Sequence, residues 1–192
     1  MDKRLNLNKI VKSNISNSLL DLMHTKNFSD ITITDIVTKA GVARASYYRN
    51  YDSKETIIRE VIYEIIQTCK NSVLKFPRQD GPIKGISQLL NSVAEYNDII
   101  KTIFHAGLSG LFLESITEFL KSTAPEKHLD DGDQWVVYAF AGALFNIINK
   151  WVQDDMKQSP EEIAGAFFKT WQNHNKESAK IFDRFYCPTK HE

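Results

Sequence analysis

Apolar side chains along most of this sequence recur every three or four residues, which is the spacing of one face of an α-helix. The first such stripe consists of Leu7, Ile10, Val11, Ile15, Leu19, Leu22 and Met23. A longer helix is predicted over 53–76, where the stripe consists of Ile58, Val61, Ile62, Ile65, Cys69 and Val73. All five prolines fall between the periodic segments, where they do not interrupt a helix. The pattern therefore predicts an all-α chain.

One stretch, residues 31–34, alternates apolar and polar side chains as a β-strand does. Thr32 followed three positions later by Asp35 is, however, the pattern of a capping box, in which two side chains satisfy free N–H groups at a helix start. The apolar residues that follow share one helical face: Ile33, Ile36, Val37 and Ala40. We therefore predict a short helix over about 33–40.

Two further helix starts carry capping residues. Asp52 and Glu55 repeat the capping-box spacing at the start of the long helix. Ser159 and Glu162 do so near the carboxy terminus, where Pro160 suits the first helical position. The periodicity predicts the remaining helices near 82–96, 97–106, 108–122, 132–155 and 159–174, with a further helical turn before Pro188.

The segment from Lys39 to Tyr51 indicates a function. Gly41 can adopt the left-handed conformation that reverses the chain, and its small neighbours Ala40 and Val42 let two helices pack closely. The segment is therefore interpreted as a helix-turn-helix with a second helix over about 43–50. Four side chains of that helix face away from the expected core and suit a DNA major groove: Arg44, Ala45, Ser46 and Tyr48.

These side chains offer different contacts. The Arg44 guanidinium can donate two hydrogen bonds to guanine or to a phosphate, and the Ala45 methyl can touch thymine. The hydroxyl groups of Ser46 and Tyr48 can reach phosphate. The neighbouring Tyr47 and Tyr51 are interpreted as packed aromatic residues. The whole chain has no net charge, but residues 1–55 carry nine basic and six acidic side chains, so the positive charge lies at the predicted DNA-binding end.

On its glycine turn, the Ser46-Tyr47-Tyr48 run and the Asp52–Glu55 helix start, the segment Phe28–Ile57 resembles the TetR family of bacterial repressors. The resemblance implies a homodimer that binds a palindromic operator in double-stranded DNA. It also implies that a small effector, bound in the carboxy-terminal body, changes the separation of the two DNA-binding heads.

The resemblance further implies that Thr32 and Thr34 contact the DNA backbone and that Lys54 clamps a phosphate. The complete set of predicted DNA-binding residues is Thr32, Thr34, Arg44, Ala45, Ser46, Tyr48, Arg49, Asn50 and Lys54. The sequence departs from the family pattern at Ala43, where a serine cap is frequent, so the recognition helix lacks that capping oxygen.

We therefore predict an all-α protein, with an N-terminal three-helix helix-turn-helix DNA-binding domain over 1–52. A long helix joins it to an α-helical regulatory and dimerisation domain over 53–186, and 187–192 form a tail. The stretch from Ala139 to Phe145, followed by Lys150-Trp151 and Ser159–Glu162, resembles the family's dimer interface. Small side chains at helical spacing, which let two helices approach closely, make up the predicted contact: Ala139, Gly142, Ala143 and Asn146.

The body also contains many aromatic side chains, each of which belongs to a core more often than to a ligand site. As a group they could line an apolar pocket between helices, where small molecules commonly bind. The candidate effector-binding residues are Tyr96, Phe104, His105, Phe112, Trp135 and Tyr138.

The remaining chemistry points away from an enzyme. The histidines are scattered and the two cysteines, Cys69 and Cys187, stand far apart, so we expect no metal, no cofactor and no disulfide framework. The glycines around Ser109 lack the spacing of a hydrolase elbow. The amino terminus lacks the apolar stretch of a signal peptide, and no run is long enough for a membrane span, which favours a cytoplasmic protein.

The sequence thus predicts a ligand-responsive DNA-binding repressor with a small apolar or aromatic effector. One alternative is a regulator of the same fold that responds to a partner protein or activates transcription. Another is a helical enzyme or adaptor in which the turn motif is accidental, although no acid–base pair, nucleophile or phosphate loop can be assembled for it.

Overall fold

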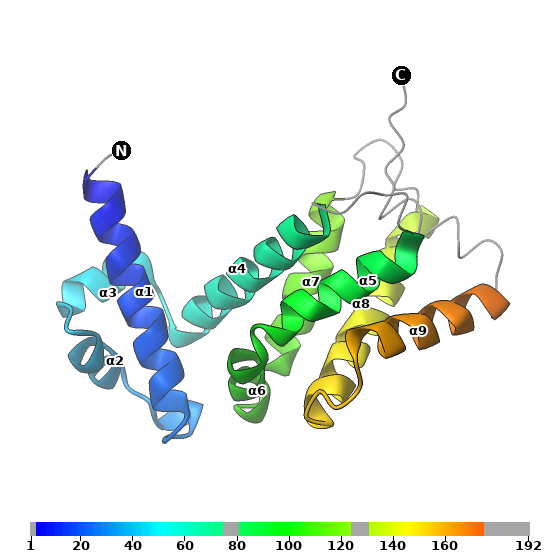
Figure 1. The fold of residues 1–192 in the computed structure, drawn as a ribbon. Helices are drawn as coiled ribbons and strands as arrows, with labels where there is room; N and C mark the ends of the chain where they lie inside the picture. The colour runs from blue at the N-terminus through cyan, green and yellow to red at the C-terminus, as the bar shows by residue number, and fades with distance from the viewer. Residues whose placement is uncertain (1–2, 75–80, 124–130, 175–192) are drawn as a thin grey trace. The chain divides into compact units, whose positions relative to one another are not determined.

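The computed structural model describes residues 3–74, 81–123 and 131–174, and every element in these ranges is a helix (Figure 1). In chain order the elements are α1 (Lys3–Met23), the 3-10 helix η1 (Phe28–Asp30), α2 (Ile33–Ala40), α3 (Arg44–Asn50), α4 (Lys54–Leu74), α5 (Gly81–Ala94), α6 (Asn97–His105), α7 (Ser109–Thr123), α8 (Asp131–Gln153) and α9 (Pro160–His174). The all-α prediction is confirmed. The helical turn predicted before Pro188 lies outside the described residues.

The chain divides into two compact units. The first contains the residues up to Glu64 together with Asp98–Phe112, and the second contains Ile65–Asn97 and the residues from Leu113 onward. This division follows how densely the residues contact one another. The boundary predicted at residue 52 instead separates the residues expected to meet DNA from the rest of the chain, and it stays a prediction.

In the first unit, α1, α2 and α3 pack on one another around side chains that are fully buried: Ile15, Leu19, Ile36 and Tyr47. The apolar stripe predicted for α1 is buried at Ile15 and Leu19 and half-buried at Val11, Leu22 and Met23, whereas Leu7 and Ile10 are 63% and 52% exposed. Helical spacing tells which side chains share a face, but it does not tell how far along the helix a neighbour covers that face.

Capping side chains begin α2 at the predicted residue. Thr32 Oγ1 accepts a hydrogen bond from the Asp35 N–H (3.1 Å), and Asp35 Oδ2 accepts one from the Thr32 N–H (2.9 Å). At the other end Gly41 has φ +64°, in the left-handed region that glycine adopts without strain. The strand-like alternation of residues 31–34 is therefore overridden by local capping chemistry.

The prediction that Asp52 and Glu55 cap the long helix is wrong. Ser53 Oγ accepts from the Thr56 N–H (3.2 Å), and α4 begins one residue later than an Asp52 cap requires. The capping box of α9 is confirmed: the Glu162 N–H donates to Ser159 Oγ (3.2 Å) and the Ser159 N–H donates to Glu162 Oε2 (2.9 Å). Serine and aspartate are both good N-cap residues, and Ser53 is the one that directly precedes the observed helix.

The second unit buries the apolar faces of its helices, and α5 packs closely against α9. Its core includes Leu90, Val137, Phe140, Ala141 and Ile148. Trp151 is also buried, and its indole N–H donates to the Gln158 carbonyl (2.9 Å), which ties the end of α8 to the turn before α9.

Candidate DNA-binding interface

Helix α3 is oriented by its tyrosines. Tyr47 is fully buried and Tyr51, which follows the helix, is 3% exposed, so one face of α3 is held in the core as predicted. The opposite face carries exposed side chains, namely Arg44, Ala45, Tyr48 and Arg49, and Ser46 and Asn50 are half-buried. The burial of one ring in this two-turn helix and of another directly after it leaves little freedom for the outward face to rotate.

Three of the predicted DNA-binding side chains form one polar cluster. Arg44 Nη1 donates to Thr34 Oγ1 (3.2 Å), and Arg44 Nη2 donates to the Tyr48 hydroxyl (3.1 Å). The guanidinium also lies over the Tyr48 ring, 5.6 Å from its centroid. Thr34 comes from α2 and the other two from α3, so the cluster joins both helices of the motif.

This cluster can present donors to DNA. A guanidinium has five N–H donors, of which the two bonds occupy only part. The Thr34 and Tyr48 hydroxyl groups act as acceptors toward Arg44, so each keeps its own O–H for a phosphate oxygen. The arrangement therefore brings together an oriented cation and two free hydroxyl donors on an exposed face.

Two other residues predicted to contact DNA, Thr32 and Asn50, use their polar groups in hydrogen bonds within the protein. The Thr32 hydroxyl is occupied within its capping box, since it accepts from the Asp35 N–H and donates to Asp35 Oδ2 (2.8 Å). Asn50 Nδ2 donates to the Ser46 carbonyl (2.8 Å), back along its own helix. Ala43, at the start of α3, makes no side-chain capping bond, as the sequence predicts.

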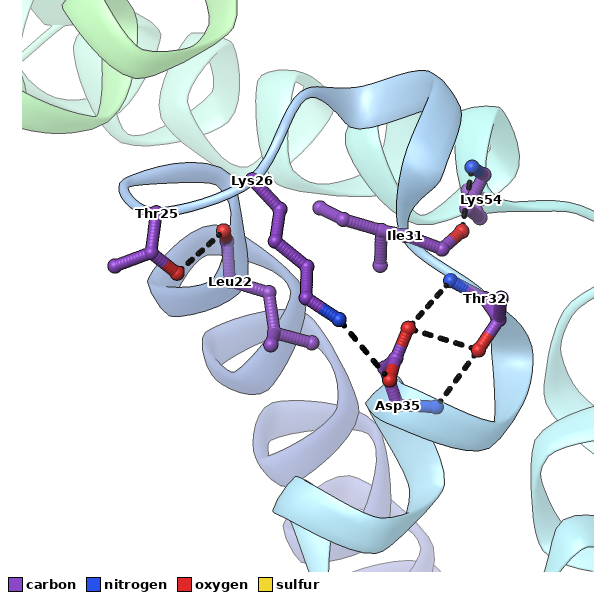
Figure 2. A network of polar contacts seen from close by, with 7 residues as sticks. All are labelled: Leu22, Thr25, Lys26, Ile31, Thr32, Asp35 and Lys54. Atoms are coloured by element: carbon purple, nitrogen blue, oxygen red, sulfur yellow. Dashed lines mark hydrogen bonds and ion pairs between the residues drawn. The ribbon is translucent and has the colours of Figure 1, made fainter.

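Lys54 lies against the protein's own backbone. Its ammonium donates to the carbonyls of Phe28 (2.6 Å), Ser29 (3.4 Å) and Ile31 (2.7 Å), and it lies 4.6 Å from the centroid of the Phe28 ring. Figure 2 shows Lys54 beside the Ile31 carbonyl, next to the capping box of α2. The sequence offered no sign of these contacts, because their partners lie 23 to 26 positions earlier in the chain.

Several cations of the first unit are paired within it. Lys26 lies 3.2 Å from Asp35, Lys39 lies 3.3 Å from Asp21, and Lys12 pairs with Glu60. Asp21 and Asp35 are among the six acidic residues already counted in residues 1–55, so of these pairs only Lys12–Glu60 lowers the excess of positive charge further. Arg44, whose partners here are hydroxyl groups, keeps its full charge toward a ligand.

The candidate effector-binding residues fall into separate groups. The rings of Phe104 and Phe112 meet edge to face in the first unit, with centroids 5.6 Å apart. Trp135 and Tyr138, on α8 of the second unit, are 74% and 47% exposed and have centroids 6.3 Å apart. The two remaining candidates are the half-buried Tyr96 and the exposed His105.

An apolar crevice lies between α5, α8 and α9 of the second unit, and none of those six residues lines it. Its lining consists of Ile86, Leu89, Leu90, Phe140, Leu144, Ile147, Ile163 and Phe167. With room for about 10 Å³, it is at the lower limit for one water molecule. A small-molecule effector would therefore have to open it.

The small side chains predicted for a dimer contact share one face of α8. Ala139 and Asn146 are exposed, and Gly142 and Ala143 are half-buried. A Cβ built on Gly142 would meet no heavy atom within 4 Å, so packing within the described chain does not require glycine there. In the described parts of the chain there is also no cluster of metal-ligating side chains, and no helix is long and apolar enough to cross a membrane.

Comparison with known proteins agrees with this architecture. Residues 17–61 match the family model described as "Bacterial regulatory proteins, tetR family", and residues 80–173 match one described as "Transcriptional regulator C-terminal region". A curated relative, the uncharacterized HTH-type transcriptional regulator YxbF of Bacillus subtilis (strain 168), is 24% identical over 169 residues. That match covers 84% of this chain but only 44% of the relative.

Two solved structures share the fold. A TetR transcriptional regulator from Streptococcus agalactiae 2603V superposes with a TM-score of 0.57 at 17% identity, covering 88% of this chain and 98% of that one. The dihydroxyacetone kinase operon activator DhaS superposes with a TM-score of 0.51 at 17% identity, covering 83% of this chain and 93% of that one. With both family models matched in order along the helices described above, the chain belongs to the TetR family of transcriptional regulators.

Proposed function

We propose that this protein is a homodimeric, cytoplasmic repressor that binds a palindromic operator through α3 and leaves it when a small apolar or aromatic effector binds the second unit. The observation that carries the DNA-binding part is the Thr34–Arg44–Tyr48 cluster on the exposed face of the motif. A guanidinium held between two hydroxyl groups has the direction that readout of a base edge or a phosphate requires. The proposal assigns no catalytic activity.

In this proposal the contact residues divide by role. Arg44 and Ala45, at the start of α3, read base edges in the major groove. Ser46 and Tyr48 bind phosphate, and Thr34 binds phosphate while it orients Arg44. Arg49 is exposed on the same helix and adds a further positive charge toward the DNA backbone.

Two substitutions test these roles. Arg44→Ala should lower operator affinity and also relax the sequence preference, by about 1–3 kcal/mol at the base pair it reads. Tyr48→Phe removes one hydroxyl and should weaken binding to specific and mixed-sequence DNA alike. Both are measured as dissociation constants in gel-shift titrations at fixed salt, because affinity without a stated salt concentration cannot be compared.

Tyr63→Phe is a matched control for the second substitution, because Tyr63 is an exposed tyrosine on α4. It should leave binding unchanged. If Arg44→Ala and Tyr48→Phe, as folded proteins, kept full affinity for both kinds of DNA, the recognition helix would have been assigned wrongly.

Activation is the second candidate function. It is favoured by the fold that the chain shares with DhaS, which is named as an operon activator. A repressor and an activator of this fold would bind DNA in the same way, and they would differ in the response of the adjacent promoter. Deleting the gene should raise transcription of its target if the protein represses and lower it if the protein activates, and this measurement decides between them.

A further inference from the structure

The ammonium of Lys54 has a complete set of partners within the protein. A lysine ammonium carries three N–H donors, and three backbone carbonyls surround this one, two of them at 2.6 and 2.7 Å. Its side chain is half-buried, and its charge also lies over the Phe28 ring. A phosphate would have to displace one of these partners to bind this ammonium.

The three carbonyls belong to the first two residues of η1 and to Ile31, which follows it. The Phe28 carbonyl also accepts a hydrogen bond from the Ile31 N–H (3.4 Å), which is longer than the bond from Lys54 (2.6 Å). Lys54 donates to all three carbonyls from the first residue of α4. It thus joins η1 and the residue after it to the first turn of α4.

The bonded segment leads directly into the DNA-reading helices. The Ile31 carbonyl, which accepts from Lys54, belongs to the residue immediately before Thr32, the N-cap of α2 (Figure 2). Two residues after that N-cap, Thr34 Oγ1 accepts a hydrogen bond from the Arg44 guanidinium. The bonds therefore connect the start of α4, the start of α2 and the recognition helix, all inside the first unit.

We propose that Lys54 is a positioning residue, which ties the first turn of α4 to the residues before α2 and so orients Thr34 and Arg44, and that it makes no phosphate contact. The positioning role rests on the proposed function, because it has an effect only in a protein that binds DNA. The tie, meaning the hydrogen bonds from Lys54 to the carbonyls of Phe28, Ser29 and Ile31, is a property of the DNA-free protein.

Chemical modification of the unaltered protein tests the tie directly. Acetic anhydride acetylates free amines, and mass spectrometry reports the rate for each lysine. Lys54 should react much more slowly than Lys26 and Lys39, which are more exposed, in the absence of DNA. Adding a long mixed-sequence duplex should leave the rate at Lys54 unchanged. A lysine that reacts as fast as Lys26 and becomes protected by DNA would overturn the proposal.

Substitution tests the role in binding. Lys54→Met keeps most of the aliphatic stem and removes the donors, so affinity for the duplex should fall about tenfold. The slope of log affinity against log salt should stay at the wild-type value, because no phosphate contact is lost. Loss of a phosphate contact would reduce that slope by about 0.9, and this result, or unchanged affinity, contradicts the proposal.

Two further variants make the result specific. Lys54→Gln removes the charge but keeps N–H donors for the carbonyls, so it should bind DNA more tightly than Lys54→Met, and it carries the test if Lys54→Met does not fold. Lys26→Met removes one positive charge from the same loop without touching the carbonyls, so it should keep near wild-type affinity. Equal losses for Lys54→Gln and Lys54→Met would argue for a charge contact with DNA and against the tie.

The outcomes also separate this proposal from the one on which it rests. A wild-type protein without affinity for any duplex would overturn the proposed function and the positioning role together. A fast-reacting Lys54 in a protein that does bind DNA would overturn the tie alone.

Discussion

The two buried tyrosines that anchor α3, Tyr47 and Tyr51, differ in the hydrogen bonding of their hydroxyl groups. Tyr47 is fully buried and its hydroxyl has no hydrogen-bond partner, whereas the Tyr51 hydroxyl has Glu60 as a partner. Burial raises the pKa of both hydroxyl groups. A buried polar group without a partner costs about 1–3 kcal/mol, so we expect Tyr47→Phe to raise the free energy of unfolding by about 1 kcal/mol.

Tyr51→Phe is the matched control, because it removes the same atom from a hydroxyl that has a partner. It should lower the free energy of unfolding, which denaturant titration measures for both variants. Equal destabilisation by the two substitutions would mean that the Tyr47 hydroxyl is satisfied in solution.

At the scale of elements, two helices begin with a capping box that contains a carboxylate. A hydrogen bond from the Thr32 N–H lowers the pKa of Asp35 below its ordinary value of 3.8, and the Ser159 N–H does the same to Glu162, below 4.5. A lowered pKa means that the ionised form stabilises the folded protein above the ordinary value, and that this stability is lost as the pH falls through the lowered one. Acid should therefore weaken both helix starts.

Asp35→Asn removes one of these titrating groups. We expect the wild-type melting temperature to fall more steeply than that of Asp35→Asn as the pH is lowered from about 5 to 3. Asp21→Asn, which removes a carboxylate of the same unit outside any capping box, should retain the wild-type profile. Parallel curves for wild type and Asp35→Asn would show that the box of α2 does not contribute to the acid response.

At the scale of the whole molecule, the proposed dimer depends on a face that the single chain leaves open. Gly142 has no heavy atom within 4 Å of the position of an added Cβ, so Gly142→Leu should fold, and leucine favours a helix more than glycine does. On a symmetric interface the new side chain meets its own copy, so the dimer should dissociate. Operator affinity should fall with it, because two linked heads bind more tightly than one.

Light scattering at micromolar concentration gives the mass of each variant. Gly110→Leu is the control, since Gly110 lies on α7 and is equally open. It should stay dimeric. A Gly142→Leu protein that remained dimeric, or a wild type that was monomeric, would remove α8 from the proposed interface.

The sequence by itself determined the helices and the helix-turn-helix motif, because the signals for them lie within a few residues of one another. Thr32, Asp35 and Gly41 mark both ends of α2, and its observed bounds are those predicted. The two tyrosines that anchor α3 were likewise predicted to be packed, and they are buried. Local capping and helical spacing need no information from the rest of the chain.

Only the tertiary structure decided how those helices use their polar side chains. The partners of Lys54 are backbone carbonyls, which any sequence possesses, at a position set by how α4 meets η1. The bond between Arg44 and Thr34 likewise depends on the angle between two helices. The exposure of Leu7 depends on where neighbouring helices end. Such contacts join residues that are distant in sequence, and no periodicity or local motif encodes a distance between two elements.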